Sequence, residues 1–311
     1  MLEIFRSPNY NFIGKRRWAY LASGIFTLIA MISLVTQGLR YDIDFTGGTL
    51  VQVRFEKTPS VADIRGALSK IGLGESVIQE FGTSDEFILR LPLSASSSEE
   101  IAKKISSALS NTSSLGKFEI RRVEFVGPQV GKDLQWQAIY AVLFSLIGIL
   151  AYIAIRFDLK GGTAAVIAVF HDVLVCLGAI SLTHREFSLP VLAALLTIIG
   201  FSVNDTIVAY DRLRENRGKF APKGKTFAQQ MNDAVNQTLS RTVLTSLTVL
   251  FSAVVLFAFG GRTLEDFAFV LLVGAITGTY STTYIAAALV VDWTEYVEGR
   301  IRRGKKAVAK A

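Results

Sequence analysis

Six long stretches of this sequence are almost free of charged residues, and they constrain the fold more than any other feature. A helix that crosses a bilayer needs about 20 apolar residues. Four of the stretches contain at least 20 residues without Asp, Glu, Lys or Arg, and the third and fourth are each interrupted by a single Asp. We therefore expect an α-helical polytopic protein with six transmembrane helices, at residues 18–39, 134–155, 161–183, 187–210, 238–261 and 267–291.

The composition agrees with a membrane protein and excludes several other classes. Hydrophobic residues make up 50% of the chain and charged residues only 19%. A single cysteine cannot form an internal disulfide, and two histidines with one thiol cannot supply the usual ligands of a zinc site. No nucleophile stands in a pattern with a matched base. We expect no metal, no cofactor and no enzymatic activity.

The distribution of basic residues predicts the orientation of the spans. In a soluble chain a net charge of +7 would suggest binding to nucleic acid, but cytoplasmic loops of membrane proteins also carry a basic excess. With the N-terminus inside, the inner segments hold eighteen Lys and Arg residues, and the short outer turns hold two. Residues 1–17 and the basic tail 292–311 are therefore expected to be cytoplasmic, as is a basic loop at 212–225. No nucleic-acid partner is expected.

The one sizeable polar segment, residues 40–133, is then periplasmic and long enough for a small domain. Alternating apolar residues predict strands, and a helical period predicts two amphipathic helices. The order is strand, helix, strand, strand, helix, strand, which is a ferredoxin-like α+β domain. The expected elements are strand 49–55, helix 61–71, strands 77–81 and 86–91, helix 99–109 and strand 118–126.

Charged residues inside the spans are the candidate functional residues, because a carboxylate at bilayer depth costs roughly 2.5 to 3.5 kcal/mol and needs a partner or a proton. Asp205 lies in the fourth span, and Arg241 lies at a comparable depth in the fifth. Pairing in one conformation and separation in another would make Asp205 release and take up a proton. The alternative is that Arg241 extends to the headgroups and Asp205 is a buried structural acceptor.

A second polar group lies in the third span. His171 could relay protons and Asp172 is a secondary candidate, but adjacent helical residues point about 100° apart, so the two need not serve one pathway. The alternative is structural, with Asp172 packed against Asn204 or Thr206. In the sixth span, Gly274 and Gly278 form a G-x-x-x-G pattern, which predicts close helix packing rather than a ligand site.

Three segments resemble the SecF family: Leu39–Thr49, Val123–Gly131, and Gly200–Val208 with its continuation Asp211–Asn216. SecF proteins are subunits of the bacterial SecD–SecF export complex and are related to the RND transporter superfamily. The resemblance implies an inner-membrane subunit that works beside SecD and the SecYEG channel. It implies that the complex uses the proton-motive force to assist export of preproteins.

Two other classes share parts of this pattern. A half-unit of a proton-driven RND-type lipid or drug exporter would have the same spans, but would need a larger outer domain to hold its substrate. A six-span ion channel would need a pore loop or a ring of charges, and the outer turns near residues 184–186 and 262–266 are too short. Co-purification of a SecD-like chain would decide for the export subunit, and a homodimer would favour the exporter.

Overall fold

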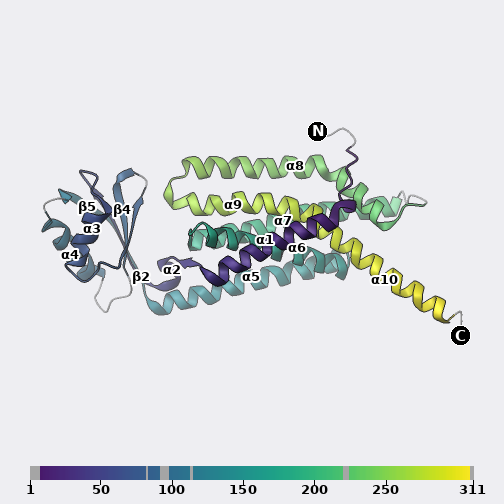
Figure 1. Cartoon of the computed structure of the whole chain (residues 1–311), viewed down its shortest axis with the longest axis horizontal. Coiled ribbons are helices and arrows are strands. Elements are labelled where there is room, and N and C mark those ends of the chain that lie inside the picture. Colours follow the sequence, from purple (N-terminus) through teal and green to yellow (C-terminus); the bar gives the residue numbers. More distant parts are fainter. Residues whose placement is uncertain (1–7, 82, 92–97, 113–114, 220–223, 309–311) are drawn as a thin grey trace.

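The computed structural model has two parts, a helical bundle and a small α/β domain at one end of it (Figure 1). It describes residues 8–81, 83–91, 98–112, 115–219 and 224–308. The first and last described segments both lie at the end of the bundle away from the α/β domain, which we call the far end. The segments 1–7 and 309–311, part of the predicted N-terminal segment and tail, fall outside the described residues.

The α/β domain confirms the predicted ferredoxin-like order. Its elements are β2 (Gly48–Phe55), α3 (Val61–Ser69), β3 (Val77–Phe81), β4 (Thr83–Leu91), α4 (Ser98–Ser110) and β5 (Phe118–Val126). The strands form one antiparallel sheet in the order β3-β4-β2-β5. Alternate residues of the central strands, such as Val51 and Leu89, pack against Leu68 of α3 and Ile105 of α4. The period-2 pattern of the strands therefore decides which face the two helices cover.

In the part of the chain that the structure describes, six helices are long and apolar enough to cross a membrane, as predicted. They are α1 (Arg16–Thr36), which follows a short 3-10 turn, α5 (Pro128–Arg156), α6 (Leu159–Leu182), α7 (Leu189–Lys219), α8 (Phe227–Phe259) and α9 (Arg262–Ser281) with its continuation. Several run past the predicted spans. In particular, α7 continues to Lys219, so the prediction of a loop beginning at Arg212 is wrong. The charged residues after Tyr210 continue α7 as a helix beyond the apolar span, because charged residues can be accommodated in a helix outside the bilayer.

Side-chain caps define where two of these helices begin. The Asp158 carboxylate accepts a hydrogen bond from the Gly161 amide at 2.6 Å and starts α6. Thr226 and Gln229 form a reciprocal capping box at the start of α8. These contacts satisfy backbone N–H groups that have no partner within the helix.

The sixth span is not a single regular α-helix. After Ser281 the chain forms a π-helical turn, Thr282–Ala286, before α10 (Ala287–Val308) leads away from the bundle (Figure 1). Such turns widen a helix by one residue and occur often at functional sites. The break lies beside the polar cluster described below.

Glycines allow close helix packing at two crossings. A Cβ atom on Gly274 would lie 2.5 Å from Cγ1 of Ile198 on α7, so the predicted packing role of the G-x-x-x-G pattern is confirmed. A Cβ on Gly178 of α6 would lie 2.2 Å from that of Ala30 on α1. Only a residue without a side chain fits at either point.

The connection between the α/β domain and the bundle was not predicted. The two-residue strand β1 (Arg40–Tyr41) pairs in parallel with β6 (Glu186–Phe187), which lies between α6 and α7. A short helix, α2 (Ile43–Thr46), follows β1, and Gly47 and Gly48 then turn the chain into β2 with φ of 72° and 144°. Both angles are in the region that favours glycine.

Arg90 of β4 adds an electrostatic link across the same junction. Its guanidinium forms ion pairs with Asp42, at 3.2 Å, and with Glu186. Its side chain is only 16% exposed. The α/β domain is thus tied to the connector between α6 and α7.

Candidate functional site

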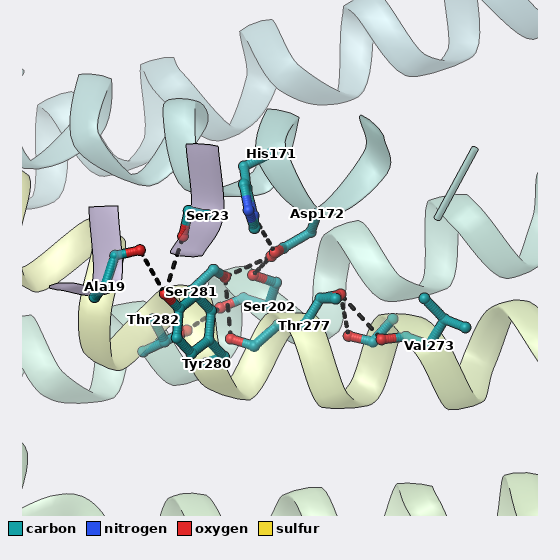
Figure 2. Close-up of polar contacts among 12 residues, drawn as sticks. Ala19, Ser23, His171, Asp172, Ser202, Val273, Thr277, Tyr280, Ser281 and Thr282 are labelled. Carbon is teal, nitrogen blue, oxygen red and sulfur yellow. Dashed lines mark hydrogen bonds and ion pairs between the residues drawn. The ribbon is translucent and has the colours of Figure 1, made fainter. Parts of the chain in front are cut away.

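A cluster of polar side chains lies between the apolar helices, where residues of α6, α7 and α9 meet (Figure 2). Its centre is Asp172 of α6, which is fully buried. The Asp172 Oδ2 atom accepts hydrogen bonds from the hydroxyls of Ser202 on α7, at 2.7 Å, and Ser281 on α9, at 2.6 Å. One carboxylate therefore joins three helices and has the donors that a buried polar group requires.

His171 is part of the same cluster, and whether it serves one proton pathway with Asp172 stays an open prediction. Its Nδ1 atom lies 3.1 Å from the Asp172 Oδ1 atom, although the two residues are adjacent on one helix. The side chain of His171 bends toward the carboxylate (Figure 2). Its other ring nitrogen, Nε2, is buried and has no hydrogen-bond partner among the described residues.

Thr206 joins the cluster through hydroxyl contacts. Its Oγ1 atom donates to the carbonyl of Ser202 at 3.2 Å and lies 3.2 Å from Oγ1 of Thr282, the first residue of the π-helical turn. The structural alternative for Asp172 named the wrong neighbours, because Ser202 and Ser281 contact it rather than Asn204 or Thr206. Asn204 is exposed on the surface of α7. The rotation of α7 about its axis decides which of its residues contacts Asp172, since Ser202 and Asn204 lie on different faces of the helix.

Asp205, the main candidate, lies three residues after Ser202 on α7, faces α8 and is 2% exposed. Its Oδ1 atom accepts one long hydrogen bond, 3.4 Å, from the Thr245 hydroxyl on α8. Its Oδ2 atom is buried without a partner among the described residues. The Asp172 carboxylate accepts two short hydrogen bonds from hydroxyl groups, whereas the Asp205 carboxylate accepts only the long one from Thr245 among the described residues. A carboxylate so poorly solvated at mid-helix needs compensation by a proton or by a counter-charge.

Among the described residues, Arg241 is in no ion pair with Asp205, although the positive charge of Arg241 acts on that carboxylate from a longer distance. The side chain is exposed on the surface of α8, and Thr245, one turn further along, occupies the position beside Asp205. The carbonyl of Arg241 accepts a hydrogen bond from the Thr245 hydroxyl at 3.1 Å. Pairing in another arrangement stays a prediction.

Sequence reasoning missed Ser202, Thr245, Ser281 and Thr282 as parts of these sites. The only sequence signal was their presence within otherwise apolar spans. Serine and threonine hydroxyls commonly donate a hydrogen bond to a carbonyl in the preceding turn of their own helix, as that of Thr245 also does. Their presence in a span therefore does not show which neighbouring helix they face.

In the described part of the chain, six apolar helices, an extramembrane α/β domain inserted after the first, and two carboxylates buried within the spans define an integral membrane protein of the transport class. Residues 104–296 match the family model "Protein export membrane protein SecD/SecF, C-terminal", and residues 32–59 match the "SecD/SecF GG Motif", which includes the two glycines before β2. The chain belongs to the SecD/SecF family of protein-export membrane proteins, on the SecF side of it.

Curated relatives support this membership over nearly the whole chain. The protein translocase subunit SecF of Desulfurispirillum indicum is 45% identical and covers 94% of both chains. That of Calditerrivibrio nitroreducens is 42% identical and covers 93% of this chain and 96% of its own. The matches favour the export subunit over the exporter and channel alternatives.

Two solved structures have the same fold. A crystal structure of SecDF, a translocon-associated membrane protein from Thermus thermophilus, is 40% identical with a TM-score of 0.81. The match includes 93% of this chain and 39% of the SecDF chain. SecDF in its super-membrane-facing form is 39% identical, with a TM-score of 0.71, and this chain spans 41% of it.

Proposed function

We propose that this chain is an accessory subunit of the bacterial Sec translocase that, with SecD, uses the proton-motive force to assist export of preproteins across the cytoplasmic membrane. The observation that carries the proposal is Asp205, a carboxylate buried in the inner half of the fourth span, with one oxygen unpaired among the described residues, in the segment Gly200–Val208 that resembles the SecF family. Such a group is suited to exchange a proton between two environments.

The proposed orientation places both termini in the cytoplasm and residues 40–133 in the periplasm. Eighteen basic residues in the inner segments against two in the outer turns support it. In the structure the α/β domain and the described ends of the chain lie at opposite ends of the bundle, as this orientation requires (Figure 1).

The exposed surface of α7 and α8 supports a second membrane half as the partner. Arg241 and Asn204 are exposed there, within their predicted spans, and Leu244, one turn after Arg241, is 38% exposed. A cation facing lipid at that depth is costly. The solved SecDF chains are longer than this one by more than half of their length. We infer that SecD covers this surface and that SecYEG and the exported preprotein contact the assembled pair.

In the proposed mechanism Asp205 carries the proton and Arg241 is its counter-charge in one arrangement of the helices. Thr245 holds the carboxylate in the arrangement described above. Asn204 and Thr206 on α7, and His171 with Asp172 on α6, are secondary candidates for the proton path. One proton crossing about 100 mV supplies roughly 2.3 kcal/mol, which is comparable to the bias needed between two helix arrangements.

Export into inverted membrane vesicles, with and without an imposed proton gradient, tests the proposal. Asp205→Asn should assemble with SecD normally, since it removes a membrane charge, and should lose the stimulation by the gradient. Asp85→Asn, in the α/β domain, is the matched control and should keep it. A full gradient response in Asp205→Asn would leave Asp205 as a structural residue and overturn the proton-carrier role.

A further inference from the structure

A cleft of about 680 Å³ opens at the far end of the bundle, away from both polar sites. It lies between the turn that joins α5 to α6, the last turns of α7, the first turn of α8 and the middle of α10. Figure 1 shows these helix ends together on the side where α10 leaves the bundle. None of the residues in the proton mechanism lines it.

Three basic side chains line the cleft: Lys160, Arg214 and Arg217. Within the described part of the chain none of them is in an ion pair. Arg214 donates one hydrogen bond, at 3.3 Å, to the carbonyl of Arg156. The Arg217 guanidinium stacks over Phe227 at 5.3 Å from the ring centroid, which leaves its N–H groups free to bind an anion.

Three basic residues near the cleft, by contrast, are paired with carboxylates. Arg156 forms an ion pair with Asp211 at 2.8 Å, Arg212 with Glu215 at 2.8 Å, and Lys225 with Asp233 at 2.6 Å. Among the described residues, Lys160, Arg214 and Arg217 therefore place three cations without a carboxylate partner in one cleft. Such a concentration of unpaired cations attracts an anion.

The cleft also contains a negative side and an apolar floor. Glu298 of α10 is exposed and, among the described residues, has no ion pair, whereas Asp158 is occupied with the cap of α6. Leu213 and Val290 are buried at its base. A ligand that fills it should carry an anionic group, a cationic group and an apolar part.

The depth of the cleft identifies the source of such a ligand. The apolar part of α7 ends at Tyr210, and the charged residues begin at Asp211, so the cleft lies where the helices pass from hydrocarbon to headgroups. Basic pockets between transmembrane helices on the cytoplasmic side are suited to lipid headgroups. The apolar floor would be of no use to a free anion such as inorganic phosphate.

We propose that this cleft binds a phospholipid through a phosphoethanolamine headgroup. The phosphate contacts Lys160, Arg214 and Arg217, the ammonium group faces Glu298, and the glycerol and first methylenes lie on Leu213 and Val290. Lipid binding here would hold α10 against the end of α7. The cleft does not depend on the export role, because it shares no residue with the proton site.

Native mass spectrometry of the full chain, released from nanodiscs of defined composition, tests this proposal. Phosphatidylethanolamine and phosphatidylglycerol with the same acyl chains are compared as probes. Removing two cations in Arg214→Gln/Arg217→Gln should weaken retention of both lipids about thirty-fold, since each cation near a headgroup contributes about one kcal/mol. The matched control is Arg212→Gln/Lys225→Gln, which removes two paired cations outside the cleft and should change retention little.

Two further arms separate the parts of the proposal. Glu298→Gln should reduce the preference for ethanolamine over glycerol headgroups and leave phosphatidylglycerol retention intact. An unchanged preference would overturn the ethanolamine assignment. Competition with millimolar inorganic phosphate should not displace the lipid, and displacement would show a free-anion site instead. Equal retention by the cleft variant and its control would overturn the site itself, and Lys160→Gln provides a milder variant if the double change unfolds.

Discussion

The Asp172 carboxylate on α6 and the Ser281 hydroxyl at the end of α9 are 2.6 Å apart, and the α-helical hydrogen bonding of the sixth span breaks at the next residue. Ser281 is fully buried, so this contact is formed without competition from water. The π-helical turn that follows brings Thr282 to within 3.2 Å of Thr206 on α7. A buried carboxylate and a helix irregularity thus form one unit that holds three spans together.

Replacement of Asp172 should reveal the structural role of this unit. Asp172→Ala leaves the Ser202 and Ser281 hydroxyls and the His171 ring without their acceptor, so we expect a loss of about 3 kcal/mol of stability. Asp172→Asn keeps an acceptor oxygen and should lose much less. Thermal unfolding in mild detergent measures the difference. Similar melting temperatures for Asp172→Ala and the wild type would show that the cluster contributes nothing to stability.

A double-mutant cycle should decide whether Arg241 and Asp205 form one switch. Arg241→Met is expected to reduce gradient-dependent export, because Asp205 then loses its counter-charge. The double variant with Asp205→Asn should be no worse than either single variant. Arg241→Lys should retain part of the function, since it keeps the charge but not the planar fork. Multiplicative losses in the double variant, measured as gradient-dependent export, would refute the pairing even if each residue is essential.

The crossing of α1 and α6 should not tolerate a side chain at Gly178. The added methyl of Gly178→Ala would meet Ala30 at 2.2 Å, and separating the two helices should cost about 1 to 3 kcal/mol. Gly148→Ala is the control, because no atom lies within 4 Å of its added Cβ. We expect the control to melt within a degree or two of the wild type and Gly178→Ala to melt several degrees lower. Equal melting of the two variants would mean that this crossing adapts freely.

Loss of the Arg90 ion pairs should loosen the α/β domain relative to the bundle without unfolding it. Arg90→Met removes the contacts to Asp42 and Glu186 that cross the junction. Spin labels at the exposed positions Lys70 and Trp136 should then give a broader distance distribution in pulsed electron resonance.

The control for this experiment is Arg54→Met, which breaks an ion pair with Asp85 inside the domain. It should leave the distance distribution narrow. If the distance distribution of Arg90→Met is as narrow as that of this control, the β1–β6 pairing alone holds the junction.

Local patterns in the sequence were sufficient for the elements of this fold. The strands at 77–81 and 118–126 have the predicted bounds, because alternation along a half-buried strand is a strong short-range signal. The six spans follow from the length of apolar runs, which the bilayer thickness requires. Asp172 and Asp205 stand out for the same reason, since a carboxylate within such a run is costly.

By itself, then, the sequence determined the six spans and the order of strands and helices in the α/β domain, and only the tertiary structure decided the connector between them and which side chains meet. Asp172 could have faced Thr206 as readily as Ser202, and Arg241 could have faced Asp205 as readily as the outer surface of α8. Spans that are apolar on every side do not reveal their rotation about the helix axis, because lipid and protein neighbours favour the same residues. The pairing of Arg40 with Glu186 likewise joins positions far apart in the chain that no local period connects.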